Sequence, residues 1–158
     1  MIRPKDIERV KFNYLEKSFS FSSRTTLKKF ILTLLKTEKI QVEHINYIFC
    51  SDEYLLLINQ KFLEHDTYTD IITFQYTNQN EPVVSDIYIS IDRVKENAKR
   101  YNSSFAIELY RVLFHGALHL AGYKDKSPSD IQTMRKKEDH YLNLYVSRET
   151  KERRKANF

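Results

Sequence analysis

The chain has 158 residues and a mass of 19.0 kDa, a length that fits one domain. Hydrophobic residues make up 41% of it, including 11 Tyr and 10 Phe, which excludes a generally disordered protein. The formal net charge of +5 favours polyanionic partners such as RNA or DNA, although the same excess also fits a merely solvated surface.

The sequence shows no secretory or membrane-spanning pattern. The first ten residues, MIRPKDIERV, carry charges throughout, and no apolar signal region follows them. No stretch approaches the roughly 18 apolar residues that a membrane-spanning helix needs. The single cysteine, Cys50, excludes an intrachain disulfide and lies in an apolar run, where we expect a buried, unreactive thiol. We therefore expect a cytoplasmic protein with no membrane partner.

Strand and helix patterns alternate over the first third of the chain. The run VKFNY at 10–14 is typical of a strand, and residues 23–36 carry apolar side chains at helical spacing. The run EHINYIFC at 43–50 is rich in β-branched and aromatic residues, which predicts a second strand. Ser51 or Asp52 can then cap a second helix.

Two strands and three helices are predicted for the remainder. The strands cover 70–76 and 83–91, with the turn sequence TNQNEP between them. The helices cover 93–101, an apolar stretch at 105–121 and an amphipathic stretch at 128–147. This order predicts an α+β fold with one mixed four-stranded sheet and about five helices. We expect a single domain over 1–147, followed by a basic tail over 148–158.

The stretch HGALHLAGYKD, at 115–125, contains both glycines of the chain. Because His115 and His119 are four positions apart, they share one face of a helix and can offer two imidazoles to one metal ion. Gly122 can adopt the left-handed conformation that ends a helix, so that the chain turns back and brings Asp125 to the histidines. A lone histidine on an apolar helix is more often a core residue, but this combination predicts a three-ligand metal site at the end of a central helix.

Gly116 occupies the position at which zinc proteases of the His-Glu pattern carry their catalytic glutamate. Peptide hydrolysis by that route is therefore disfavoured. The lack of a side chain at Gly116 can leave room for substrate or allow the helix to pack closely on a strand, and the sequence is compatible with either explanation. Zinc is the metal that two imidazoles and a carboxylate predict first, while other divalent transition metals fit the same ligands.

The same stretch resembles the hallmark HGxLHLxGYDH of the YbeY family of endoribonucleases, which mature ribosomal RNA. Further blocks match in order: the family's LN…PTDVLSFP resembles IN…YTDIITFQ, and its GDI block resembles SDIYIS. The matching residues outside the histidine block are Asn59, Thr69, Asp70, Phe74, Asp86 and Ile87. The resemblance implies one zinc ion per chain, held by His115, His119 and Asp125, with the metal-bound water as the one catalytic group it assigns.

Three positions depart from the family pattern. Asp125 stands where the family usually has a third histidine, and it could instead pair with a neighbouring lysine. Leu63 replaces an arginine that the family associates with activity, and Lys61 and His65 are the nearest basic side chains. Ser85 replaces a glycine, a change that we expect to be mild.

The resemblance implies a single-strand-selective, metal-dependent endoribonuclease that acts in 3′-end maturation of small-subunit (16S) rRNA and in rRNA quality control. Its partners would be pre-rRNA and the small ribosomal subunit. One alternative is a ribosome-associated RNA-binding protein with a structural metal and little catalysis; another is a metallohydrolase of a different substrate. The basic residues of the late helix and tail are candidate RNA contacts or a solvated face: Arg135, Lys136, Lys137 and those from Arg148 onward.

Overall fold

The structure is a computed structural model that describes residues 1–15, 19 and 21–157. A short 3₁₀ helix, η1 (Pro4–Arg9), leads into the first strand. The strands are β1 (Val10–Tyr14), β2 (Val42–Cys50), β3 (Ile71–Gln75) and β4 (Val83–Ser90). The α-helices are α1 (Arg24–Thr37), α2 (Asp52–Leu63), α3 (Ile91–Arg100), α4 (Phe105–Leu120) and α5 (Pro128–Ala156).

The four strands form one mixed sheet in the order β1-β2-β4-β3. Strand β2 pairs in parallel with both β1 and β4, whereas β3 runs antiparallel to β4 at one edge. The α+β fold with a mixed four-stranded sheet, predicted from the sequence, is confirmed. Strands β1 and β3 are the two edge strands, and β3 follows the loop after α2.

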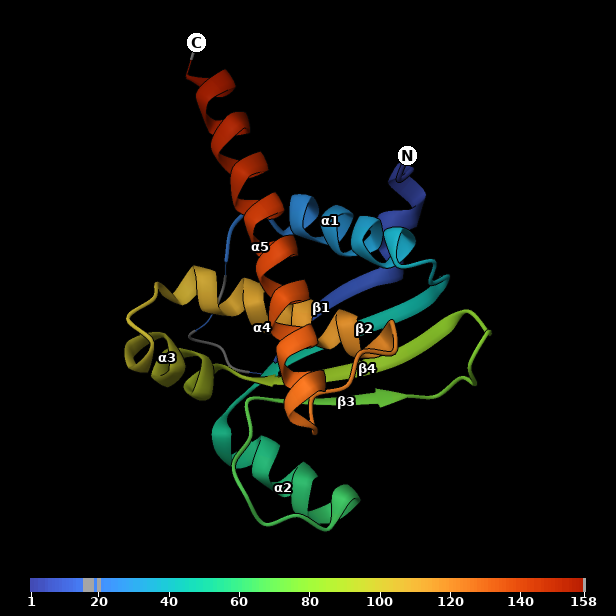
Figure 1. Ribbon diagram of the computed structural model, residues 1–158, viewed down its shortest axis with the longest axis vertical. Coiled ribbons are helices and arrows are strands. Elements are labelled where there is room, and N and C mark those ends of the chain that lie inside the picture. Colours follow the sequence, from blue (N-terminus) through green and yellow to red (C-terminus); the bar gives the residue numbers. More distant parts are fainter. Residues whose placement is uncertain (16–18, 20, 158) are drawn as a thin grey trace.

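Helices cover the two faces of the sheet unequally (Figure 1). Helix α4 lies against one face with α1 beside it, and α5 packs on the outer side of α4, while α2 lies on the opposite face. The main core fills the α1–α4–α5 side and includes residues that are fully buried, such as Ile87, Leu113 and Phe114. A smaller core forms under α2 from Cys50, Leu55, Ile58 and Ile72.

Helix starts follow local hydrogen-bonding chemistry. The hydroxyls of Ser51, Ser90 and Ser104 each accept a hydrogen bond from a backbone N–H in the first turn of the helix that follows, which satisfies an otherwise unpaired donor. Ser127 does the same for α5, where Pro128 supplies a pre-set first turn. Each cap therefore sits where a strand or loop gives way to the helix.

Helix α5 is longer than its amphipathic pattern predicts. It continues through most of the segment expected as a tail and ends at Ala156. None of the helices among the described residues is long and apolar enough to cross a membrane. The buried thiol predicted for Cys50 is confirmed, and burial raises the pKa of that thiol to about 12.

Candidate metal centre

The two histidines of the central helix face each other one turn apart. His115 and His119 lie in the last two turns of α4, and their Nε2 atoms are 2.9 Å apart. Both side chains are partly exposed, 18% for His115 and 27% for His119, although the helix around them is buried. The spacing of four residues therefore presents both rings on a helix face that opens to solvent.

A left-handed glycine turns the chain back toward these histidines. Gly122 has φ +98°, a conformation that side-chain-bearing residues rarely adopt, and it follows directly after the helix cap at Ala121. The turn is held by the N–H of Tyr123, which donates to the carbonyl of Leu118 at 3.1 Å. This reversal brings Oδ2 of Asp125 to 3.3 Å from Nε2 of both His115 and His119.

The other nitrogen of each ring has an acceptor of its own. Nδ1 of His115 donates to Oε2 of Glu138 on α5 at 2.8 Å, and Nδ1 of His119 donates to the carbonyl of Tyr123 at 2.9 Å. Each ring thereby holds its proton on Nδ1, as is usual for histidines that bind a metal through Nε2. The two Nε2 lone pairs and the Asp125 carboxylate then converge on one point.

This convergence fits a small divalent cation. The ligand atoms of His115, His119 and Asp125 lie within 4.8 Å of one another and form a group that could hold a metal ion. Tetrahedral ligands about 2.05 Å from a zinc ion stand about 3.3 Å apart, close to the separations of 2.9 and 3.3 Å found here. Two lone pairs facing a carboxylate repel one another unless a proton or a metal cation lies between them.

Glu138 lies beside the site, although the sequence patterns did not predict it. It is 6% exposed, and its second oxygen lies 3.3 Å from Nη1 of Arg111, which also pairs with Asp139 at 2.8 Å. A carboxylate within the buried stripe of α5, between Met134 and Tyr141, is unusual enough to have been a signal. Its hydrogen-bond partner His115, however, lies 23 positions earlier on α4, so no local spacing in the sequence connects the two residues.

The surroundings of the two rings shift their pKa values in opposite directions. Burial lowers the pKa of His115, but its hydrogen bond to Glu138 and the nearby carboxylates outweigh burial, so the pKa lies above its ordinary value. Burial and the charge of His115 together hold the pKa of His119 below its ordinary value. Burial raises the pKa of Asp70, against the opposing effect of His115. At neutral pH, His119 is therefore ready to act as a neutral ligand.

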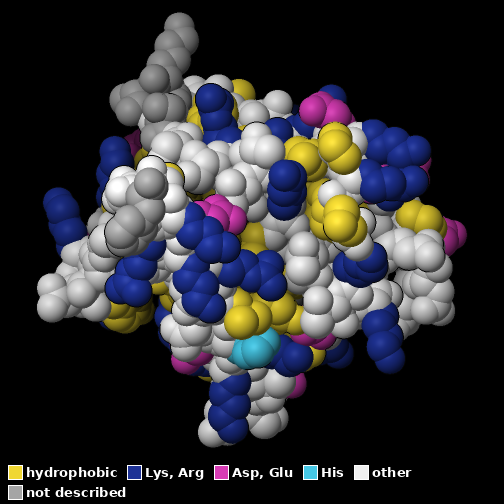
Figure 2. Space-filling view, turned by 90° about the horizontal axis from the view of Figure 1, so that it is seen from above, with side chains coloured by type: hydrophobic (Ala, Val, Ile, Leu, Met, Phe, Trp, Pro, Cys, Tyr) yellow, Lys and Arg dark blue, Asp and Glu magenta, His cyan; other side chains and the backbone are white. Residues whose placement is uncertain are grey.

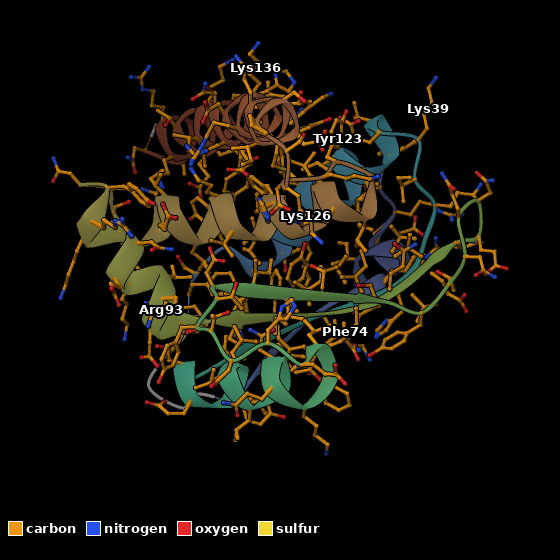
Figure 3. The ribbon with its side chains drawn as sticks, turned by 60° about the horizontal axis from the view of Figure 1, so that its bottom comes forward. Lys39, Phe74, Arg93, Tyr123, Lys126 and Lys136 are labelled. Carbon is orange, nitrogen blue, oxygen red and sulfur yellow. The ribbon has the colours of Figure 1, made fainter. Side chains whose placement is uncertain are left out.

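The three side chains line one cleft, and His119 also borders a second hollow. A cleft of about 740 Å³ is lined by His115, His119 and Asp125 together with the loop between α2 and β3. A second cavity of about 770 Å³ lies under the β3–β4 turn and shares Gln75, His119 and Leu120 with the first. Lys126 lines the cleft and lies beside α4, over the β3 edge of the sheet (Figure 3). The two hollows therefore adjoin each other at His119.

Gly116 packs α4 tightly onto the sheet. A Cβ atom at this position would lie 3.0 Å from Cδ1 of Ile71 and 3.2 Å from Cγ2 of Ile87. Of the two readings of this glycine, the structure supports close helix–strand packing. Because the helix approaches β3 and β4 so closely, the neighbouring His115 is held at a fixed height above the sheet edge.

Comparison with known proteins shows the family of this chain. The family model described as Endoribonuclease YbeY matches residues 11–146, which include all of the sheet except Val10, the whole of α4 and the three candidate ligands. The chain belongs to the YbeY family.

Relatives in this family are similar over most of their length. An Endoribonuclease YbeY from Cytophaga hutchinsonii is 49% identical over 126 residues, which are 80% of this chain and 88% of that protein. One from Flavobacterium johnsoniae is 47% identical over 136 residues, 86% of this chain and 96% of that protein. A solution structure of a Thermotoga maritima protein has a TM-score of 0.65 and 28% identity, and covers 90% of this chain and 93% of that one.

Asn59, a residue shared with the YbeY motifs, helps to position a loop of the cleft. The Nδ2 of buried Asn59 donates to the carbonyl of Thr67 at 2.8 Å, which fixes the loop that lines the cleft.

Ser85, in place of a YbeY glycine, is buried, and its hydroxyl donates to the carbonyl of Phe74 at 2.7 Å. The substitution is accommodated by a hydrogen bond between β4 and β3, in line with a mild effect.

The position of the YbeY arginine also faces this cleft. Leu63, which occupies it, ends α2, is 40% exposed and lines the cleft together with His65. Lys61 instead lines a separate apolar hollow along α2. Of the two basic side chains considered as substitutes for the arginine, His65 is therefore the one at the cleft, and Lys126 is a further basic residue there.

Proposed function

We propose that this chain is a single-strand-selective, metal-dependent endoribonuclease that acts in 3′-end maturation of 16S rRNA and in rRNA quality control. The observation that carries the proposal is the convergence of His115, His119 and Asp125 in an open cleft of a YbeY family member. Relatives that are 49% and 47% identical carry the name Endoribonuclease YbeY. RNA is therefore the substrate class.

We propose one zinc ion as the metal, bound by Nε2 of His115, Nε2 of His119 and a carboxylate oxygen of Asp125. The separations of these atoms and the donor set of two imidazoles and one carboxylate support zinc. Three protein ligands in an open cleft leave room for substrate, as in catalytic rather than structural zinc sites. When bound, such an ion supplies Lewis acidity toward a phosphoryl oxygen and lowers the pKa of water.

The protein's own groups bind and orient the RNA in this proposal. Lys126 is exposed at the cleft and attracts the phosphate on which the cut is made. The ring of Tyr68, 53% exposed at the same cleft, stacks on an unpaired base, and Arg93 lies over this ring, 4.8 Å from its centre. A base can reach this ring only outside a duplex stack, which supports single-strand selectivity.

The second candidate function is RNA binding with little catalysis. It is favoured by Leu63, which places an apolar side chain where the family has an arginine at the cleft. Arginine binds phosphate through a planar pair of donors, and neither His65 nor Lys126 reproduces that geometry. Cleavage rate, rather than RNA binding, separates this candidate from the endoribonuclease.

The test combines metal content with cleavage of a single-stranded RNA. Wild type is expected to bind one zinc ion per chain and to cut the RNA, whereas His119→Ala loses both properties. Asp125→Asn is expected to bind the ion more weakly, because a neutral amide is a poor ligand. His140→Ala, which removes an exposed histidine of α5, is the matched control and keeps both properties. Full metal content in His119→Ala would refute the site, and RNA binding without cleavage by wild type would select the second candidate.

A further inference from the structure

Helix α5 extends beyond the body of the domain. Near this end, the guanidinium of Arg148 lies over the ring of Phe30, and Glu149 accepts a hydrogen bond from the hydroxyl of Tyr110 at 3.3 Å. Among the described residues, no later residue of α5 makes a hydrogen bond, ion pair or cation–π contact of this kind with another element. Residues 151–157 are all exposed. Figure 1 shows the end of α5 projecting past α1, away from the rest of the chain. The projecting end is defined as residues 147–157, which include Arg148 and Glu149 in contact with the body and lie beyond the match to the family model, which stops at 146.

The projecting end is strongly basic on one side. At about 100° per residue, four basic side chains fall within an arc of roughly 120°. They are Arg148, Lys151, Arg154 and Lys155. Glu149 and Glu152 lie outside this arc, so the arc carries no negative charge. Figure 2, which looks onto the side of the molecule where α5 ends, shows Lys and Arg side chains gathered there.

Local interactions explain why so polar a segment stays helical. Glu149 precedes Arg153 by four positions, the favourable order for an ion pair along a helix, and Glu152 precedes Lys155 by three. Basic residues in the last turn also interact favourably with the negative end of the helix dipole. The helix therefore presents its charges in a fixed array.

The composition of this end selects the kind of partner. Among residues 147–157, Ala156 is the one hydrophobic side chain. Protein interfaces bury an apolar core around their aromatic and arginine anchors, and helices that lie on membranes need an apolar face; the arginines of this end have no apolar neighbours of that kind within it. A polyanion backbone needs neither, because phosphate contacts and counterion release supply the binding energy.

We propose that the projecting end of α5 is a second RNA-binding surface, which holds the phosphate backbone of the substrate without reading its sequence. This inference rests on the proposed function, since it assigns the partner as RNA. Glu138, which contacts the metal centre, and Lys155 are 17 positions apart on α5, or about 26 Å along the helix axis. An RNA must span that distance to occupy the cleft and the projecting end together.

The experiment neutralises three exposed charges and varies the length of the RNA. The variant is Lys151→Gln, Arg154→Gln and Lys155→Gln, because glutamine preserves helix propensity. The matched control is Lys95→Gln, Lys99→Gln and Arg100→Gln, which removes two lysines and one arginine from exposed positions of α3. Binding is measured in a His119→Ala background, where the RNA stays intact. The probes are a long rRNA fragment and an oligonucleotide too short to span the distance.

The α5 variant is expected to bind the long fragment about tenfold more weakly, and its slope of log K against log salt falls by about 2 to 3. Binding of the short oligonucleotide, and its cleavage when His119 is present, stay unchanged. Unchanged affinity for the long fragment, or an equal loss in the α3 control, overturns the proposal; the first result points to an acidic protein as partner. If wild type cleaves neither RNA, the proposed function fails, while the binding comparison still decides on this surface.

Discussion

The hydroxyl of Tyr123 donates a hydrogen bond of 2.8 Å to Oε2 of Glu38, which ties the loop before Asp125 to the end of helix α1. The other oxygen of Glu38 accepts from Nζ of Lys137 at 3.0 Å and from the hydroxyl of Tyr141. Because the carbonyl of the same Tyr123 accepts from His119, this cluster also helps to position a candidate metal ligand. Glu38 therefore links stability to the geometry of the site.

This cluster makes stability depend on pH. Burial opposes ionisation of Glu38, but hydrogen bonds from Tyr141, Lys137 and Tyr123 outweigh it and hold the pKa of the carboxyl below its ordinary value of 4.5. A depressed folded-state pKa means that the carboxylate stabilises the protein above that ordinary value, and the contribution is lost as pH falls through the folded-state pKa. Urea unfolding of wild type and Glu38→Gln, from neutral pH to about pH 3, is expected to show a difference that shrinks on acidification. A constant difference contradicts the assignment.

Glu138 is expected to strengthen metal binding through His115 without touching the ion. Loss of such a partner typically weakens metal affinity about 10- to 100-fold. Glu138→Ala should lie in that range, while Glu138→Gln should lose less because its amide oxygen still accepts from Nδ1. Competition with a chromophoric chelator measures the affinity. Asp139→Ala is the control, since Asp139 also pairs with Arg111 but is not the partner of His115; an equal loss in that variant would point to Arg111 instead.

The substitution Gly116→Ala is expected to have two opposing effects on stability, one from helix propensity and one from packing. Alanine is favoured over glycine in a helix by about 1 kcal/mol. The new Cβ, however, would lie 3.0 Å from Cδ1 of Ile71 and 3.2 Å from Cγ2 of Ile87, and overpacking of this kind costs about 1–3 kcal/mol. We expect a net loss in the free energy of unfolding, measured in urea, and partial recovery on adding Ile71→Val, which removes that Cδ1. A variant more stable than wild type would show that the sheet yields easily.

Cys50 is expected to resist alkylation in the folded protein. Burial, with smaller effects from Asp92 and Asp52, raises the pKa of its thiol to about 12, and the thiolate is the reactive form. Mass spectrometry after iodoacetamide treatment near pH 8 should find the native chain unmodified and the urea-unfolded chain modified once. Rapid labelling of the native chain would mean that the small core under α2 opens readily.

The extension of α5 shows where sequence patterns lose their information. The apolar stripe that predicts a helix over 128–147 ends where α5 leaves the body of the domain, so the residues after it carry no amphipathic signal. They remain helical through the continuing backbone ladder, and their acidic and basic residues are spaced favourably for charge pairs; hydrophobic periodicity detects neither effect. The other elements with two predicted ends match the structure to within two residues, because caps and hydrophobic spacing are local. The end of α2 and the short helix η1 were not predicted.

Local sequence patterns were sufficient to predict the strands, the core helix, the turn at Gly122 and the return of Asp125 to His115 and His119. Each of these follows from positions close together along the chain, where helix geometry and glycine's freedom act directly. The roles of Glu138 and Glu38 beside the site, and the position of Leu63 at the cleft, became evident from the packing of the elements. Those relationships depend on how α5, α1 and α2 pack around the sheet, and packing joins residues that no local spacing connects.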